Sequence, residues 1–215
     1  MATTQMLTTN HPIILLDMPM HADSMQVDEN WTLYDCADML VEIIQNLGLQ
    51  KVIAVGHSWG SMTIMRAFIK SPEYFEKVIL FNMPTRSLSK TDLRRWKINH
   101  IFLGMRGFYM SQVAKTFYYK ENYKINPELK KYLYGVMGPM DKRTITKTDA
   151  EVIMSVQDSY HMLGKITVPA FFIIGRHDYV RIPENYPSYI SESAHLTPME
   201  DPGRSNYYLR EIVGK

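Results

Sequence analysis

The residues with the clearest potential for chemistry form the pentapeptide Gly56-His57-Ser58-Trp59-Gly60. A short apolar run at residues 51–55 precedes it, and a helical stretch at residues 61–70 follows and ends at Ser-Pro. Gly-X-Ser-X-Gly between a buried strand and a helix is typical of the sharp turn that displays a serine nucleophile. The pattern predicts that Ser58 is such a nucleophile. A plain Gly-Ser turn in front of a helix is the alternative interpretation.

The neighbours of Ser58 have distinct expected parts in this turn. Gly56 and Gly60 are expected to remove side chains where the strand and helix backbones approach each other. The helix N-terminus behind Ser58 favours developing negative charge. The backbone N–H of Trp59 is predicted to point into the oxyanion position, and His57 is expected to support the turn without acting as the base.

Apolar runs and helical patterns alternate around this turn. They predict buried strands at residues 11–17, 51–55, 77–81 and 168–174, and helices at 31–47 and 61–70. Thr32 with Asp35 resembles a capping box, and Gly48 suits the end of the same helix. The alternation predicts an α/β fold, a mostly parallel sheet with helices on both faces and right-handed crossovers.

Residues 85–165, here called the cap segment, interrupt that alternation and predict several helices, most clearly at 92–102 and 127–136. They hold 15 Lys/Arg and 7 Asp/Glu, a net of +8, whereas the rest of the chain holds 9 and 15, a net of −6. Aromatic side chains and methionines are frequent in the cap segment, which suits an apolar lid over an acyl pocket. Ordinary packing of helices on the core is the alternative.

Composition narrows the class of protein. The chain has 215 residues, of which 46% are hydrophobic and 21% charged, an ordinary globular balance. A net charge of +2 does not favour nucleic-acid binding. No stretch predicts a signal peptide or a membrane span. The one cysteine, Cys36, excludes an internal disulfide and favours a cytoplasmic location.

Four segments of the chain resemble the α/β-hydrolase family. Residues 12–24 are similar to its strand followed by Asp-Leu-Pro-Gly-His-Gly-X-Ser, and residues 47–60 to its Leu-Gly-Leu-X-Lys…Gly-His-Ser-X-Gly. Residues 168–178 are similar to its Val-Pro…Ile-Gly-X-X-Asp, and residues 194–202 to its Gly-His…Glu-X-Pro. The resemblance implies a core formed by residues 1–84 and 166–215, with the cap segment inserted into it.

The family's triad order of serine, acid and histidine is matched by Ser58, Asp178 and His195. By resemblance, His195 takes the proton of Ser58, and Asp178 holds the imidazole in the required tautomer. Asn82 stands at the family's alternative acid position, so Asp178 is preferred. Serine at position 58 disfavours the relatives that use an aspartate nucleophile.

Three departures from the family weaken the expectation of catalysis. The chain resembles the family only from the helix after its first strands, to which residues 1–9 are similar, so the resemblance lacks the N-terminal strands and the His-Gly oxyanion loop. Met20 and Ala22 replace two usual glycines. Only 16 residues separate Asp178 from His195, too few for a strand and a full helical crossover, so the loop that carries His195 is expected to be poorly placed.

The sequence therefore predicts a serine hydrolase that cleaves a small or medium acyl ester or a related carbonyl compound, without metal or organic cofactor. An impaired turnover is expected, because one oxyanion donor is missing. The excess of positive charge in the cap segment predicts a preference for anionic substrates. Acyl transfer and carbon–carbon hydrolysis use the same triad. The alternative is a weak or inactive hydrolase-like binding protein, or a truncated gene product.

Overall fold

The computed structural model describes residues 11–19, 21, 24, 31–181 and 183–214. Within them, four strands form one parallel sheet whose spatial order equals their order along the chain. The strands are β1 (Val52–His57), β2 (Phe75–Phe81), β3 (Ala170–Gly175) and β4 (Ser188–Ser191). The predicted α/β class and the three predicted strands from residue 51 onward are confirmed.

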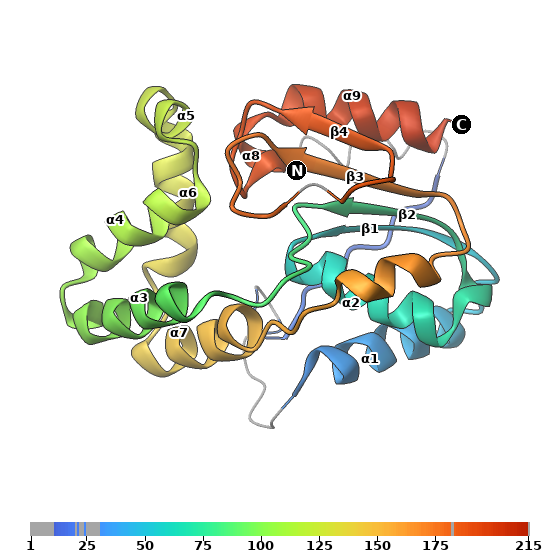
Figure 1. The fold of residues 1–215 in the computed structure, drawn as a ribbon, viewed down its shortest axis with the longest axis horizontal. Helices are drawn as coiled ribbons and strands as arrows, with labels where there is room; N and C mark the ends of the chain where they lie inside the picture. Colours follow the sequence, from blue (N-terminus) through green and yellow to red (C-terminus); the bar gives the residue numbers. More distant parts are fainter. Residues whose placement is uncertain (1–10, 20, 22–23, 25–30, 182, 215) are drawn as a thin grey trace.

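Helices cover both faces of the sheet (Figure 1). Helices α1 (Leu33–Asn46) and α2 (Trp59–Lys70) lie on one face, whereas α8 (Thr197–Glu200) and α9 (Pro202–Val213) lie on the other. Side chains of β2 alternate between the two layers. Val78 and Leu80 join the cluster formed with α1 and α2, while Ile79 and Phe81 join the cluster formed with α9. This two-residue period is what a strand buried on both faces requires.

Local sequence signals set the ends of α1 as predicted. Thr32 accepts a hydrogen bond from the backbone N–H of Asp35, whose carboxylate accepts from the Thr32 backbone in return. This reciprocal pair satisfies donors that the first helical turn leaves free. Gly48 follows the helix with a φ of +66°, a left-handed conformation that glycine adopts without steric cost.

The cap segment runs between β2 and β3 and is helical. It contains α3 (Lys90–Ile101), α4 (Arg106–Phe117), α5 (Lys120–Ile125), α6 (Pro127–Met137), α7 (Lys142–Thr148) and a π-helical stretch (Asp149–Met154). The helices predicted at 92–102 and 127–136 are α3 and α6. The group lies to one side of the sheet (Figure 1) and has a hydrophobic cluster of its own between Leu103 and Ile145. The division of the chain into a core and a cap domain stays a prediction.

The strand predicted at residues 11–17 is wrong. This stretch has no regular secondary structure, and Leu15 in it is 76% exposed. Among the described strands, β1 pairs only with β2, so no ladder hydrogen bonds fix residues 11–17. An apolar run becomes a strand only where a neighbouring backbone can pair with it. The resemblance of residues 1–9 to a family helix, and the replacements at Met20 and Ala22, lie outside the described residues.

The connection from β3 to β4 is irregular instead of helical. The described residues within 176–187 contain no helix, which is consistent with Pro183 and Pro187 in this stretch, and β4 is four residues long. It still pairs in parallel with β3, from Phe172 opposite Ser188 to Gly175 opposite Ser191. None of the described helices is long and apolar enough to cross a membrane.

Candidate active site

Ser58 lies in the sharp turn between β1 and α2. Its backbone φ of 50° and ψ of −108° are rare for a residue with a side chain. Strain of this kind costs about 1–3 kcal/mol and persists only where the surroundings enforce it. The Ser58 N–H donates to the Phe81 carbonyl over 2.8 Å, and its own carbonyl accepts from Met62 N–H over 3.1 Å. The strained turn expected from the pentapeptide is therefore present.

The two glycines of the pentapeptide differ in their surroundings. A Cβ on Gly56 would lie 2.6 Å from the backbone of both Gly60 and Ser61, so only glycine fits there. A Cβ on Gly60 would meet no described atom within 4 Å. The expectation that both glycines permit close backbone approach is correct for Gly56 and wrong for Gly60, because the space beside the Gly60 Cα is open among the described residues.

Each of the four parallel strands brings one polar residue to the same edge of the sheet. Ser58 follows β1, Asn82 follows β2, Asp178 comes shortly after β3, and His195 comes shortly after β4. The carboxyl ends of parallel strands meet at one edge, which is where open α/β sheets place their sites. The topology thus gathers residues that lie up to 137 positions apart.

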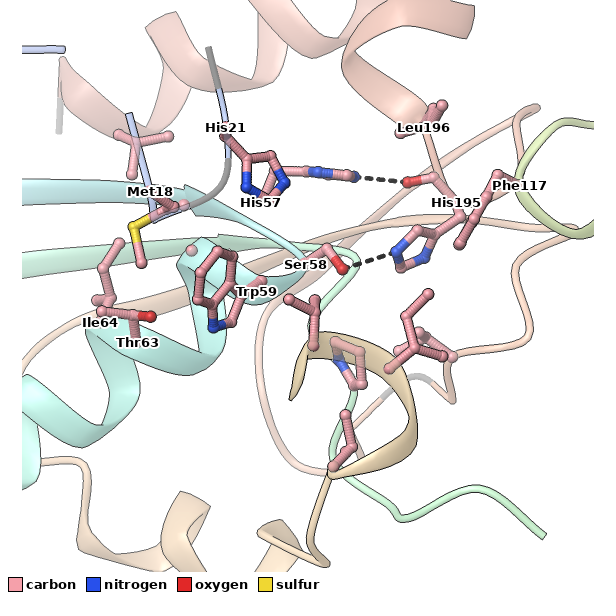
Figure 2. A pocket seen from close by; sticks show the side chains of 18 of the residues that line it. Met18, His21, His57, Ser58, Trp59, Thr63, Ile64, Phe117, His195 and Leu196 are labelled. Atoms are coloured by element: carbon pink, nitrogen blue, oxygen red, sulfur yellow. Dashed lines mark hydrogen bonds between the residues drawn. The ribbon is translucent and has the colours of Figure 1, made fainter. Parts of the chain in front are cut away.

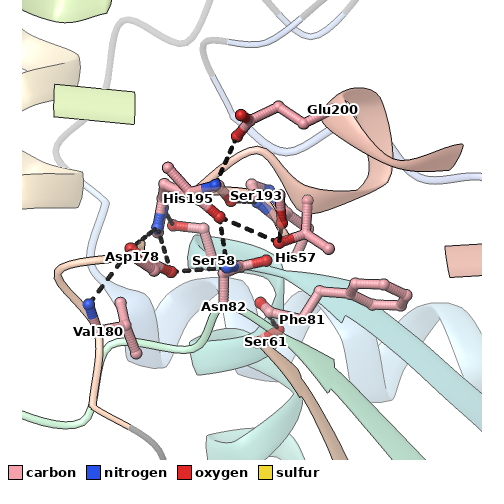
Figure 3. A network of polar contacts seen from close by, with 12 residues as sticks. His57, Ser58, Ser61, Phe81, Asn82, Asp178, Val180, Ser193, His195 and Glu200 are labelled. Atoms are coloured by element: carbon pink, nitrogen blue, oxygen red, sulfur yellow. Dashed lines mark hydrogen bonds and ion pairs between the residues drawn. The ribbon is translucent and has the colours of Figure 1, made fainter. Parts of the chain in front are cut away.

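Three of these side chains form a continuous hydrogen-bonded chain (Figure 3). The Nε2 atom of His195 lies 2.8 Å from Ser58 Oγ. Its Nδ1 atom lies 3.1 and 3.2 Å from the two carboxylate oxygens of Asp178. The side chains of His195 and Asp178 are only 3% and 0% exposed. Because the carboxylate accepts from Nδ1–H, Nε2 is free to accept the hydroxyl proton of Ser58.

The expectation that His195 is poorly placed is wrong. The short β4 and its irregular connection leave enough chain to return His195 to the sheet edge, since none of the described residues between Asp178 and His195 is helical. Gly175 contributes to the placement of His195, because the absence of a side chain lets the loop that carries His195 pass close to the end of β3. A Cβ there would lie 2.1 Å from the Ala194 carbonyl oxygen.

Asn82 belongs to the same network, although the sequence reasoning noted it only as the alternative acid position. It is fully buried, and its φ of 47° places it in the left-handed region that asparagine tolerates. Its Nδ2 donates to Asp178 Oδ2 over 2.6 Å and to the Ala194 carbonyl over 3.1 Å. Asn82 therefore ties the carboxylate to the loop that carries His195. A polar residue directly after the buried run 77–81 was the available signal.

His57 supports the site from the other side of the imidazole. Its Nε2 lies 2.7 Å from the His195 carbonyl oxygen and must carry the proton, because a carbonyl only accepts. Loss of hydration and the nearby His195 lower the pKa of His57 to about 4. A neutral His57 can hold the His195 backbone without repelling a positive charge on the His195 ring.

A cavity opens in front of Ser58 (Figure 2). Aromatic rings stand close to His195 there: the centroid of Tyr179 lies 4.8 Å and that of Phe117 lies 5.3 Å from the centroid of the imidazole. Trp59 is buried at the start of α2, where first-turn N–H groups have no partner within the helix. Residues from the N-terminal part of the core and from the cap segment share the further apolar wall. The cap segment contributes Trp96, Val113, Tyr118, Leu133, Val136, Met137, Met140, Ile145, Val152 and Val156.

The described residues contain no group of three or more His, Cys, Asp or Glu side chains arranged to hold a metal ion. The chemistry that this edge of the sheet can perform with its own side chains is proton transfer through His195 and attack by the Ser58 hydroxyl.

Comparisons with known proteins concern the family and the fold of the chain. A family model described as alpha/beta hydrolase fold matches residues 6–203. Strigolactone esterase D14 of Arabidopsis thaliana is 30% identical over 114 residues, which cover 49% of this chain and 43% of that protein. The match thus spans less than half the length of this curated relative.

Among solved structures, an enol-lactonase from Burkholderia xenovorans LB400 superposes with a TM-score of 0.78 at 17% identity, over 93% of this chain and 79% of that one. A thermophilic esterase from Thermogutta terrifontis gives a TM-score of 0.76 at 18% identity, over 92% and 77%. At such identities the likeness establishes the fold alone.

Proposed function

The chain belongs to the α/β-hydrolase fold family, and on that premise we propose that it is a serine hydrolase acting on a small or medium acyl ester. The observation that supports this most strongly is the continuous chain of hydrogen bonds from Ser58 through His195 to Asp178. The relatives named above as an esterase and an enol-lactonase point to the same class of substrate, a carboxylic ester or lactone.

In the proposed reaction, Ser58 Oγ attacks the ester carbonyl carbon while His195 Nε2 removes the hydroxyl proton. The Asp178 carboxylate holds Nδ1–H and stabilises the resulting imidazolium. The carbonyl oxygen becomes an oxyanion, for which the Trp59 N–H is one donor. His195 then returns the proton to the leaving alcohol as the carbon–oxygen bond breaks. Water, deprotonated in turn by His195, attacks the acyl-enzyme, and His195 returns that proton to Ser58 Oγ as the bond between the acyl carbon and Oγ breaks and the carboxylic acid is released.

The cavity wall indicates the kind of acyl group. Most side chains that the cap segment contributes are apolar or aromatic, which suits a hydrophobic acyl chain or ring. Its charged contributions are Arg86, Arg95 and Lys115 against Asp92 and Asp149, a net of +1. Most of the +8 of the cap segment therefore lies away from the wall.

Any preference for an anionic ester should consequently act on the approach of the substrate and weaken with salt. The test is the ratio of kcat/KM for a carboxylate-bearing and a neutral ester of equal size, at low and high ionic strength. An unchanged ratio would contradict the preference.

The direct test of function is hydrolysis of a series of activated esters by the wild-type protein and by Ser58→Ala. The variant should remain folded and lose the activity. Equal turnover by both would exclude Ser58 as the nucleophile. A family member that only binds ligands would show no Ser58-dependent turnover with any ester, and products formed with alcohols or diketones as co-substrates would reveal acyl transfer or carbon–carbon hydrolysis.

A further inference from the structure

Glu200 has no part in the reaction proposed above, although the sequence motif Glu200-Asp201-Pro202 follows the histidine closely. It is the last residue of α8, and its carboxylate points back toward the loop that carries His195 (Figure 3). One oxygen, Oε1, accepts from the backbone N–H of Ala194 over 2.9 Å. Glu200 thus holds the main chain at the residue directly before His195.

The other oxygen of Glu200 binds the cap segment. Oε2 accepts from the backbone N–H of Tyr119 over 2.8 Å and from Asn122 Nδ2 over 3.3 Å. These residues lie at and just after the junction between α4 and α5. A single carboxylate therefore joins two segments that are more than 70 residues apart, one from the sheet edge and one from the cap segment.

A second set of hydrogen bonds joins the same two segments. The backbone N–H groups of His195 and Leu196 both donate to the Phe117 carbonyl, over 3.1 and 3.2 Å. The Phe117 ring lies beside the His195 ring and lines the cavity. Residues 194, 195 and 196 are thus each tied to Glu200 or to the end of α4, so the position of His195 depends on how the cap segment is seated.

The burial of Glu200 argues against a purely incidental contact. Loss of hydration raises the pKa of its carboxyl, despite the three hydrogen bonds that favour the charged form. Burying a carboxylate is unfavourable unless its hydrogen bonds are kept. A neutral amide could pack the end of α8, but it has only one acceptor oxygen and could not present a separate oxygen to each of the two backbones.

We propose that Glu200 is a positioning residue that couples the seating of the cap segment to the alignment of His195 with Ser58. The proposal rests on the proposed function, since alignment matters only if His195 is the base. When the carboxylate is in place, His195 Nε2 lies within 2.8 Å of Ser58 Oγ, and the wall formed by Phe117 and its neighbours closes over the same point. Without it, the loop and the cap segment can separate.

The test compares Glu200→Gln, Glu200→Ala and the control Asp201→Ala. Gln keeps one acceptor oxygen for one of the two segments, whereas Ala keeps none. Asp201 is a neighbouring carboxylate that caps α9 by accepting from Arg204 N–H and also accepts from Ser191 Oγ at the end of β4. None of its described side-chain hydrogen bonds reaches residues 192–196. We expect kcat to fall about 10-fold in Glu200→Gln and about 100-fold in Glu200→Ala, the size of a misplacement of roughly 1 Å. KM should change by less than about 3-fold.

Two further measurements separate positioning from loss of stability. Asp201→Ala should lower Tm but keep the wild-type kcat, whereas Glu200→Gln should lose kcat even at temperatures far below its Tm. The proton between His195 and Asp178 should give a low-field NMR resonance in the wild type and in Asp201→Ala, and this resonance should be weakened in Glu200→Gln.

Wild-type kcat in a folded Glu200→Gln or Glu200→Ala would overturn the proposal. So would an equal loss of kcat in Asp201→Ala, because the effect would then follow stability. If the wild-type protein has no Ser58-dependent activity, the proposed function fails. The NMR comparison still tests the positioning of His195, and an unchanged resonance in Glu200→Gln would refute it.

Discussion

Replacing Asn82 by aspartate should convert a pH-insensitive support of the site into a pH-dependent one. Aspartate has nearly the same size and also tolerates the left-handed backbone at this position, where φ is 47°. The change places a second carboxyl group where the Asn82 amide now lies 2.6 Å from Asp178 Oδ2. In its protonated form the new carboxyl group can still donate one hydrogen bond to Asp178, but the bond to the Ala194 carbonyl is lost.

The size of the effect follows from Coulomb's law. Two unit charges 2.6 Å apart repel each other by about 6 kcal/mol at an effective dielectric constant of roughly 20. Two carboxylates at this distance therefore cannot both be ionised near neutral pH, and the pair keeps one proton. The variant should be active while this proton is present and should lose activity as it leaves in alkaline solution.

The assay is the pH dependence of kcat/KM for Asn82→Asp on an activated ester, from about pH 6 to pH 10. We expect activity within about 10-fold of the wild type near neutral pH, followed by a decline with rising pH that the wild type does not show. Asn46→Asp, which adds the same charge at the exposed end of α1, is the control and should follow the wild type. A profile for Asn82→Asp parallel to the wild type would refute the contact between Asn82 and Asp178.

Three more predictions concern the turn and the fold. Gly56→Ala should abolish ester hydrolysis, because the added Cβ would lie 2.6 Å from backbone atoms, whereas Gly60→Ala should retain most of the activity. The rates of ester hydrolysis by the two purified variants test this prediction. Burial lowers the pKa of His57 from 6.5 to about 4, so its contribution to stability is full above pH ~6.5 and is lost as pH falls toward 4. Between pH 6.5 and pH 4, the free energy of unfolding in urea should fall by up to about 3 kcal/mol more in the wild type than in His57→Gln. Lys77→Met should lower the free energy of unfolding in urea by about 1–3 kcal/mol, since the buried Lys77 Nζ donates to the Ile212 carbonyl over 2.7 Å; an unchanged unfolding midpoint would contradict this.

The parts of the fold that the sequence predicted are those with strong local signals. The run 51–55, the motif around Ser58 and the capping residues Thr32 and Asp35 predicted a strand, a turn and a helix from local patterns alone. Residues 11–17 carry an equally apolar pattern, yet they form no strand, because strand formation also depends on a neighbouring edge. Whether a partner strand is available depends on the whole sheet and cannot be predicted from the seven residues of this run.

In the site, too, features with a sequence signal were predicted, and features that depend on contacts between distant segments were not. The order of Ser58, Asp178 and His195 suggested a triad through resemblance, and the structure brings these three together. Sequence reasoning missed the contacts that join residues far apart in the chain. Asn82 reaches Asp178 because two parallel strands end side by side, and Glu200 reaches Tyr119 across 81 residues of chain. The doubt about the loop before His195 assumed a helical crossover, whereas an irregular connection of the same length suffices.

The central claim is that Ser58 is a nucleophile activated by His195, and covalent labelling tests it most directly. The protein is incubated with a fluorophosphonate probe, and its intact mass and the mass of the peptide that contains Ser58 are measured over time. We expect one added phosphonyl group per chain, located on Ser58, with no labelling of Ser58→Ala and much slower labelling of His195→Asn. An unmodified Ser58 peptide in the folded wild-type protein, or equally fast labelling in His195→Asn, would contradict it.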